Sequence, residues 1–283
     1  MSSALEKSLT LIELLAAHPA GLSIGEMARR TDQPASGIHR ALQELARLGY
    51  ARQLRAHGDY VLSMKLPAMG LGLLARSGIT DVAQPILDQL AGETAELIRL
   101  SVIDAGDLVW VAVAQGATSG LRYDPGQEQG VVVHLASSAG GIAWLSTMDE
   151  EEMLSRVSRQ GLRRDGGEPV AGAPVSLAEL RERVEAARRD GHSVAVDSYI
   201  PGMGAMAVPV RYRGGEPVLG CLSIAGPAVR MTPARMAALG PALAAAARDL
   251  GAVADGSQYF RNIVREHEAA PGNAGLAGET TGK

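Results

Sequence analysis

The sequence predicts a mainly helical N-terminal domain that ends in a β-hairpin, followed by a linker helix and a larger α+β domain. Three observations support this prediction. Apolar residues recur at helical spacing through the first 48 residues, two short β-rich runs follow, and the remaining chain alternates strand-like and helical patterns. The length of 283 residues also suits two domains better than one.

The composition is that of a globular protein with aliphatic cores. Apolar residues make up 46% of the chain and aromatic residues only 3%. The single cysteine, Cys221, excludes an intramolecular disulfide, so a reducing, cytoplasmic setting is expected. The longest apolar run near the middle of the chain is interrupted by Ser and Gly, and no membrane span is expected.

Charge is unevenly distributed along the chain. Residues 1–65 carry a net charge of +2, whereas the whole chain carries −4, which leaves −6 on the remainder. A basic N-terminal part on an acidic body points to binding of nucleic acid or another polyanion.

Three helices are expected in the first 48 residues. Apolar residues at helical spacing predict the first helix over 4–17. Ser23 begins the second helix, with Glu26 three residues later completing a capping box. The third helix is expected over 34–48, because a proline suits its first turn.

Two β-rich runs, 50–54 and 60–64, surround a turn at His57 and Gly58 and predict a hairpin. This order of elements within residues 4–65 is that of a winged helix-turn-helix domain, whose third helix enters the DNA major groove. A generic small α+β domain is the alternative. The six arginines between positions 29 and 55 favour the DNA-binding interpretation.

The third helix and the hairpin supply the candidate DNA contacts. Ile38, Leu42 and Leu45 are expected to face the domain core, which leaves the opposite helix face free. Polar side chains there can bind base edges or phosphates, and arginines of the wing can bind phosphates. The candidates are Ser36, His39, Arg40, Gln43, Arg52 and Arg55. From the helix alone, a solvated charged face is the alternative.

A linker helix over 66–78 is expected to lead to an α+β domain over 79–256, with an antiparallel sheet and flanking helices. Strand-like runs occupy 97–104, 108–115, 192–198, 204–212 and 217–226, and 120–126 is a further candidate strand. Helical patterns occupy 81–95, 140–146, 176–190 and 233–251, and Asp149 begins a further helix. Residues 257–283 are expected to form a largely disordered tail.

Three other patterns favour neither enzyme nor metal chemistry. The Gly202-x-Gly204-x-x-Ala207 spacing imitates a dinucleotide-binding loop, but a strand-like run follows where a helix is required. Cys221 lies in an apolar strand and is expected to be a buried thiol rather than a nucleophile paired with His134. The histidines and carboxylates lack ligand spacing, so no metal, cofactor or catalytic residue is assigned.

The turn at 137–141, with the sequence SSAGG, connects an apolar strand-like run to an apolar helix. Free amides at the start of a helix can bind a carboxylate. An ordinary turn that uses glycine for its backbone angles explains the same residues, so the sequence leaves both interpretations open.

Several segments resemble the IclR family of bacterial transcriptional regulators over residues 4–250. LSIGEMARRTDQPASGIHRALQELARLGYARQ is similar to the family pattern LSLxELAxxTGLPKSTVHRLLxTLxxxGYV. HLASSAGGIAWLS resembles HATAxGKAxLA. GHSVAVDSYIPGMGAMAVPV and LGCLSIAGP resemble GYAxDxEExxxGxxCxAxPV and AxSVSGP, in the same order and at matching spacing.

The resemblance implies a homodimer or dimer of dimers that binds a palindromic operator in double-stranded DNA. It also implies a GAF-like C-terminal domain that binds a small organic acid or related metabolite. The family's effector contacts correspond here to Ser138, Ala139, Gly140 and Ser223. Four positions depart from the pattern: Ala195 replaces Asp, Ala205 replaces Cys, Ala225 replaces Ser and Gly141 replaces Lys.

Three methyl groups in place of polar groups predict a different effector. A small hydrated acid such as glyoxylate or pyruvate would lose hydrogen bonds worth roughly 1–3 kcal/mol each. A roomier, more apolar pocket is expected, suited to a larger effector such as an aromatic or alicyclic compound. The candidates for its few polar groups are Tyr123, His134, Trp144, Asp197 and Tyr199.

The resulting hypothesis is a sequence-specific DNA-binding transcriptional regulator whose operator binding is controlled by a small metabolite, with a repressor favoured over an activator. The alternative is a small-molecule sensor that acts mainly through protein partners and binds DNA weakly. Steep salt dependence of DNA binding distinguishes the two, because neutralising phosphates releases counterions.

Overall fold

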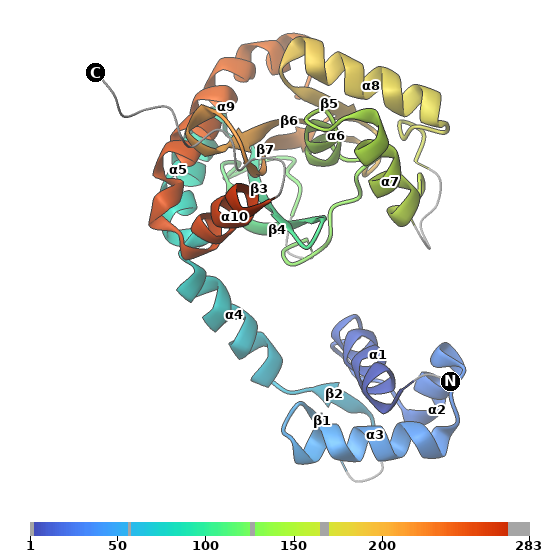
Figure 1. Cartoon of the computed structure of the whole chain (residues 1–283). Helices are drawn as coiled ribbons and strands as arrows, with labels where there is room; N and C mark the ends of the chain where they lie inside the picture. Colours follow the sequence, from blue (N-terminus) through green and yellow to red (C-terminus); the bar gives the residue numbers. More distant parts are fainter. Residues whose placement is uncertain (1–2, 56–57, 125–127, 165–169, 271–283) are drawn as a thin grey trace. The chain divides into compact units, whose positions relative to one another are not determined.

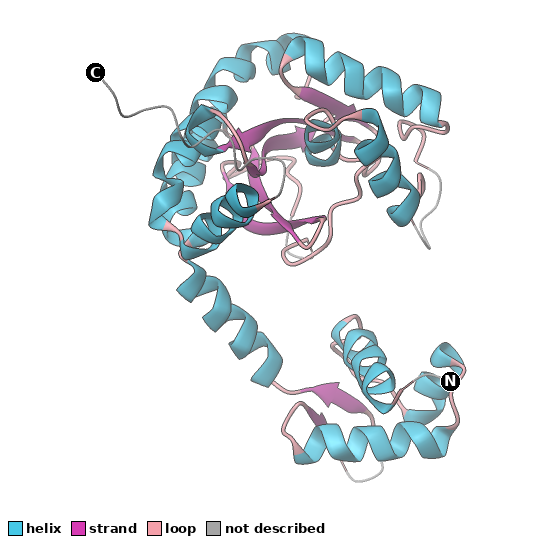
Figure 2. Ribbon diagram, in the orientation of Figure 1, coloured by secondary structure: helices cyan, strands magenta, loops and turns pink. Residues whose placement is uncertain are grey.

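The computed structural model describes residues 3–55, 58–124, 128–164 and 170–270 (Figure 1). The chain divides into two compact units, Met1–Arg76 and Ser77–Lys283. The first unit is mainly helical with a small β-hairpin, and the second combines a sheet with several helices (Figure 2). The fold class predicted from the sequence is thereby confirmed.

The first unit has the order helix, helix, helix, hairpin. Its elements are α1 (Ala4–Ala16), α2 (Ile24–Thr31), α3 (Ala35–Arg47), β1 (Ala51–Gln53) and β2 (Tyr60–Leu62). The two strands pair antiparallel, with Ala51 opposite Leu62. The predicted turn residue His57 lies outside the described residues.

Apolar side chains from all three helices and the hairpin form the core of the first unit. Ile38, Leu42 and Leu45 of α3 are buried, which confirms the predicted inward face of that helix. They pack with Leu11 of α1 and Met27 of α2. This packing fixes the opposite face of α3 toward the outside of the unit.

The predicted capping box at the start of α2 is only half formed. Ser23 Oγ accepts a hydrogen bond from the Glu26 amide at 3.2 Å. The Glu26 carboxylate binds the guanidinium groups of Arg29 and Arg30 instead of the Ser23 amide. Two arginines one turn further along the helix offer stronger, charge-assisted bonds than one backbone amide.

Helix α4 (Lys65–Ser77) occupies the position predicted for the linker helix, and none of its residues is buried. It leads into a five-stranded antiparallel sheet in the described part of the second unit, with strand order β4–β3–β7–β6–β5. The strands are β3 (Leu97–Asp104), β4 (Asp107–Gln115), β5 (Ser193–Val196), β6 (Met203–Arg211) and β7 (Val218–Pro227). Strand β7 is buried along its whole length, as expected for a strand covered on both faces.

Helices cover both faces of the sheet. Helices α5 (Ile79–Thr94) and α9 (Pro233–Val253) pack against one face. Helix α6 (Ala139–Leu145) packs against the other face, with α8 (Leu177–Asp190) beside it and α7 (Glu150–Gln160) in the same core (Figure 1). The candidate effector residues lie on the face that α6 covers.

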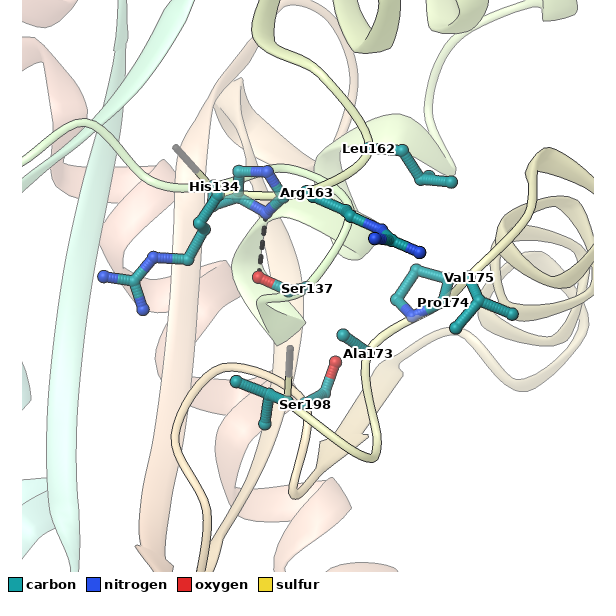
Figure 3. Close-up of a pocket in the computed structure, with 10 residues that line it drawn as sticks. His134, Ser137, Leu162, Arg163, Ala173, Pro174, Val175 and Ser198 are labelled. Atoms are coloured by element: carbon teal, nitrogen blue, oxygen red, sulfur yellow. Dashed lines mark hydrogen bonds between the residues drawn. The ribbon is translucent and has the colours of Figure 1, made fainter. Parts of the chain in front are cut away.

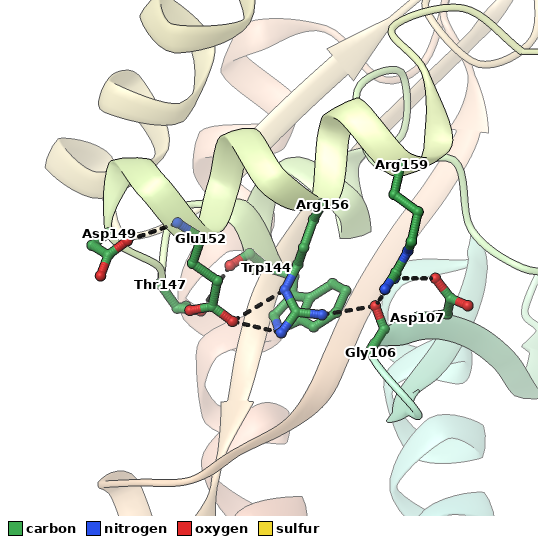
Figure 4. A network of polar contacts seen from close by, with 8 residues as sticks. All are labelled: Gly106, Asp107, Trp144, Thr147, Asp149, Glu152, Arg156 and Arg159. Atoms are coloured by element: carbon green, nitrogen blue, oxygen red, sulfur yellow. Dashed lines mark hydrogen bonds and ion pairs between the residues drawn. The ribbon is translucent and has the colours of Figure 1, made fainter. Parts of the chain in front are cut away.

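Two arginines fasten α7 to the turn between β3 and β4 (Figure 4). Arg156 donates to the Gly106 carbonyl oxygen at 2.7 Å, and its guanidinium stacks over the Trp144 ring at 4.6 Å. Arg159 binds the Asp107 carboxylate at 2.7 Å. These contacts join the α6–α7 layer to the edge of the sheet.

Two sequence predictions in this unit are wrong. The described residues Gly120–Asp124 form no strand, and the end of the predicted 120–126 run lies outside the described residues. The predicted tail begins with helix α10 (Gln258–Ala269), because Ser257 caps it and Phe260 and Val264 are buried one turn apart. The prediction of disorder for 271–283 concerns residues outside those described.

The Gly202-x-Gly204-x-x-Ala207 pattern runs into strand β6, which begins at Met203. A strand therefore stands where a dinucleotide-binding loop needs a helix. Rejecting a dinucleotide-binding loop was therefore correct, because the pyrophosphate needs a helix N-terminus. Among the described residues, no helix is both long enough and apolar enough to cross a membrane.

Candidate nucleic-acid interface and ligand cavity

The outer face of α3 presents the side chains that the sequence predicted for DNA contact. Ser36, His39, Arg40 and Gln43 are all exposed and follow one another at helical spacing. Arg52 in β1 and Arg55 in the following turn are exposed as well.

The arginines of the first unit fall into two groups. Arg29 and Arg30 bind Glu26, and Arg47 binds Glu44 one turn away on α3. Arg40, Arg52 and Arg55 form no ion pair with any residue in the described ranges. Among the arginines of residues 3–55, the three without a carboxylate partner in the described residues are the three that the sequence analysis selected as DNA contacts.

The second unit contains a cavity of about 20 Å³ between the sheet and the start of α6. Six of the eight predicted effector residues line it, namely Ser138, Ala139, Gly140, Ala195, Ala205 and Ser223. Asp197 does not line the cavity, because its carboxylate accepts a hydrogen bond from the Gly202 amide at 2.6 Å. Ala225 lies next to Ala205 in the sheet without lining the cavity.

The three alanines that depart from the family pattern form one row across the sheet. Ala195 of β5 is opposite Ala205 of β6, and Ala205 is opposite Ala225 of β7. In an antiparallel sheet, directly opposed residues point to the same face. The departures therefore replace three neighbouring polar groups by a continuous methyl surface.

The start of α6 uses most of its polar groups internally. Ser138 Oγ accepts from the Gly141 amide at 2.9 Å and donates to the His134 carbonyl oxygen at 2.8 Å. The Ser138 amide donates to the same oxygen at 3.2 Å. The sequence analysis proposed the amides at this turn as ligand contacts. Among the described residues, the amides of Ala139 and Gly140 have no hydrogen-bond partner, whereas the Ser138 amide has one.

Gly141, which stands where the family has Lys, is required by close packing. A Cβ atom at this position would lie 2.4 Å from the Cα and carbonyl oxygen of Leu135. The replacement of Lys by Gly141 is therefore explained by the close approach of the Leu135 backbone, and it gives no information about the ligand.

Sequence reasoning missed the charged pair at the cavity wall. Arg99 of β3 lines the cavity with only 4% of its surface exposed, and it binds the carboxylate of Glu128, which is 6% exposed. The Arg99 guanidinium also lies over the Trp110 ring at 4.8 Å. Its Nε has no hydrogen-bond partner among the described residues.

Aromatic side chains complete this wall. The rings of Trp110 and Tyr199 meet edge to face at 5.3 Å, and both residues line the cavity. Tyr123 donates to the Glu128 carboxylate at 3.0 Å. Burial, followed by the nearby Glu128 charge, raises the pKa of Tyr123 to about 12, so this phenol keeps its proton at neutral pH.

The remaining polar candidates lie elsewhere. Trp144 is buried in the core beneath α7. His134 lines a second, larger cavity of about 170 Å³, where its Nδ1 is 2.8 Å from Ser137 Oγ (Figure 3). Apolar residues such as Leu162, Pro174 and Val175 form much of that wall. None of the eight predicted effector residues lines the second cavity.

The expectation of a roomier pocket is wrong for this conformation. About 20 Å³ holds roughly one water molecule. The space that the three alanines leave is occupied by longer side chains, since Arg99, Trp110, Tyr199 and Met203 all line the cavity. The prediction named Tyr199 as a possible polar group of the pocket but left out Arg99, Trp110 and Met203.

Cys221 is buried in β7, and burial raises the pKa of its thiol. A thiol held in its neutral form is a poor nucleophile, as the sequence analysis concluded. In the described ranges, no group of three or more His, Cys, Asp or Glu side chains is arranged to hold a metal ion.

A winged-helix unit whose outer arginines have no carboxylate partner in the described residues, followed by an α+β unit with an internal cavity, is the architecture of a DNA-binding regulator. Comparison with known families identifies it further. Residues 4–55 match the IclR helix-turn-helix domain, and residues 71–252 match the family described as bacterial transcriptional regulator IclR C-terminal. The chain therefore belongs to the IclR family of bacterial transcriptional regulators, and it is a regulator rather than an enzyme.

Relatives agree with this assignment. The acetate operon repressor of Salmonella typhimurium is 26% identical over 246 residues, which span 87% of this chain and 88% of the repressor. An IclR regulator from Alicyclobacillus acidocaldarius has the same fold, with a TM-score of 0.70, 21% identity and coverage of 88% and 97% of the two chains. An IclR homologue from Microbacterium hydrocarbonoxydans, solved with 4-hydroxybenzoate, has a TM-score of 0.68, 20% identity and coverage of 88% and 99%.

Proposed function

We propose that this protein is a repressor that binds a palindromic operator through α3 and the hairpin, and that a small effector bound in the cavity beside α6 controls this binding. The main evidence for DNA binding is that some arginines of the first unit bind a carboxylate whereas others do not. Arg40, Arg52 and Arg55 are exposed and have no carboxylate partner in the described residues, so their charges are available to phosphates. Because a transcription regulator acts on the chromosome, the proposal assigns it to the bacterial cytoplasm.

Electrophoretic mobility shift with the upstream intergenic DNA tests this half. Arg40→Ala is expected to abolish specific binding, because it removes an unpaired cation from the centre of the outer face of α3. Arg47→Ala is the matched control: the same change on the same helix removes an arginine that Glu44 already neutralises. Equal losses in both variants, or binding that is insensitive to salt, would contradict the assignment.

The ligand half of the proposal assigns an aromatic or alicyclic effector larger than glyoxylate or pyruvate. The methyl row of Ala195, Ala205 and Ala225 and the rings of Trp110 and Tyr199 favour an apolar ring. A structural neighbour of this chain binds 4-hydroxybenzoate, which is such a compound. Because the cavity is small in this conformation, the effector must displace a side chain to enter.

A thermal-shift screen of the intact protein tests the effector class. Aromatic and alicyclic metabolites are expected to raise the melting temperature, since a ligand that binds only the folded state stabilises it. Stabilisation by glyoxylate or pyruvate, without any effect of ring compounds, would contradict the assignment of a ring compound as the effector. Compounds that stabilise the protein are then added to the mobility shift, where they are expected to change operator affinity.

The proposal includes a homodimer or dimer of dimers, and α4 as the element that transmits the effector signal. Exposed apolar side chains on α4, including Met69 and Leu73, and on α1, including Leu5 and Leu9, support burial against a second copy. Effector binding then shifts the population of domain arrangements, which changes the separation of two α3 helices on the operator.

A further inference from the structure

Arg99 stands out as a charge in the middle of the sheet. Strand β3 lies between β4 and β7, and Arg99 is opposite Ser223 of β7, which also lines the cavity. Only 4% of its surface is exposed. Arginine is rarely buried to this extent unless an anion neutralises it.

The anion that neutralises Arg99 comes from a connecting segment. Glu128 lies between β4 and α6, outside any helix or strand, and Tyr123 of the same segment donates to it at 3.0 Å. The cation therefore lies on a strand that pairs on both sides, whereas its carboxylate partner lies in a turn outside the sheet, where the Glu128 carbonyl oxygen accepts a hydrogen bond from the Val131 amide at 3.1 Å.

Arg99 has binding capacity that Glu128 does not use. A guanidinium offers five N–H donors in a fork that fits a carboxylate on two sides. Glu128 accepts from Nη1, and Nε remains without a partner among the described residues despite its burial. A planar oxyanion that engaged both Nε and an Nη atom would satisfy the site better than Glu128 does.

From these observations, and resting on the proposed function, we infer that Arg99 is the anion-binding residue of the effector cavity and that the effector's carboxylate replaces Glu128 on it. The exchange keeps one carboxylate on one buried guanidinium, so no charge is left unpaired at the wall. The effector class is thereby narrowed to a ring compound that carries a carboxylate.

The charge of Glu128 also sets the selectivity. A neutral compound of the same shape cannot replace the charge that Glu128 supplies to Arg99. The carboxylate of a ring acid is therefore recognised, whereas the corresponding amide is excluded although its shape is nearly identical. Glu128 lowers the affinity for true ligands as well, because every ligand must compete with it.

The test uses isothermal titration calorimetry on the full chain with four ring acids (benzoate, 4-hydroxybenzoate, phenylacetate and cyclohexanecarboxylate) and their amides. In Glu128→Gln the competing charge is gone while the shape is kept, and at least one acid is expected to bind at least about tenfold tighter than to the parent. Glu96→Gln is the matched control. It neutralises another buried carboxylate, but the arginine that this carboxylate binds, Arg230, does not line the cavity as Arg99 does, so affinity is expected to stay unchanged.

A double variant, Arg99→Met with Glu128→Met, guards against a folding defect, because replacing both members of a buried ion pair by apolar residues is often tolerated. It is expected to unfold cooperatively and to bind no acid better than its amide. The inference is overturned if no acid binds Glu128→Gln at millimolar concentration, if the amides bind equally well, or if the double variant still selects acids.

Mobility shifts with the same compounds separate this inference from the proposed function. If neutral ring compounds change operator binding while the charge variants have no effect, effector control of the operator is supported and the anion-binding role of Arg99 is rejected. If Glu128→Gln tightens acid binding while no compound changes operator affinity, the anion-binding role of Arg99 is supported and effector control of the operator is rejected.

Discussion

Gly37 is the residue at which the DNA-binding helix departs most simply from its family. It occupies the third position of α3, and a Cβ atom built there meets no atom within 4 Å. The resemblance places Thr or Ser at this position, so the helix lacks a side chain near the end expected to meet DNA. Nothing in the fold of the domain requires glycine here.

Gly37→Thr is therefore expected to be tolerated and to bind the operator as tightly as the parent or more tightly. The exposed helix gains a few tenths of a kcal/mol, since glycine is among the poorest helix formers. Gly37→Ala separates the effects: it stabilises the helix by about 1 kcal/mol without adding a hydroxyl group. Loss of operator affinity in both variants, by mobility shift, would mean that the backbone itself must approach the DNA.

Gly141 is the opposite case, a glycine that the fold cannot replace. Gly141→Ala is expected to destabilise the protein by roughly 1–3 kcal/mol, because its Cβ would overlap the Leu135 backbone at 2.4 Å. The neighbouring Gly140→Ala serves as control, since its Cβ would find only ordinary contacts from 3.7 Å outward. Urea unfolding that gave both variants the same stability would show that the turn can relax.

At the scale of residues, the sequence predicted the family positions of the cavity but not its charge. Ser138, Ala205 and Ser223 were found because they sit in recognisable segments. Arg99 could not be found, because its partner Glu128 lies 29 residues away and no local pattern links the two. The surrounding sequence LIRLSVID has the pattern of an apolar core strand, and nothing in it indicates that its arginine binds a distant carboxylate.

At the scale of elements, prediction succeeded where capping and periodicity agreed. Asp149 and Ser176 accept hydrogen bonds from the third residues of α7 and α8, as N-cap residues do. It failed for α10, whose twelve residues are mostly polar and bury only Phe260 and Val264. Two buried residues give too weak a periodicity to outweigh a composition rich in charged side chains.

Phe260, the only phenylalanine in the chain, is expected to anchor α10 to the second unit. Phe260→Ala should lower the free energy of unfolding by about 3–5 kcal/mol, the usual cost of removing a buried ring. Tyr259→Phe is a milder comparison that removes the hydrogen bond to the Ile103 carbonyl oxygen, worth about 1 kcal/mol. If chemical denaturation gave similar, small effects for both, α10 would be peripheral to stability.

At the scale of the whole molecule, the proposed self-association depends on exposed apolar side chains of the linker helix. Met69 and Leu73 lie one turn apart on α4 and are 52% and 69% exposed. Met69→Glu with Leu73→Glu is expected to weaken the dimer at least tenfold in sedimentation equilibrium, and operator affinity with it. Val229→Glu, at an isolated site 79% exposed, is expected to change neither, and an unchanged dimer in the double variant would refute this use of α4.

The strand order also governs when each unit becomes complete during synthesis. Residues 97–102 of β3 pair with residues 220–225 of β7, so the centre of the sheet cannot form until residue 225 has left the ribosome. The first unit ends at Arg76 and needs none of these later residues. At translation rates of about 5–20 residues per second, the intervening stretch takes roughly 7–30 s. Each newly made chain thus carries a complete DNA-binding domain for that interval before it has a sheet in which any effector could bind.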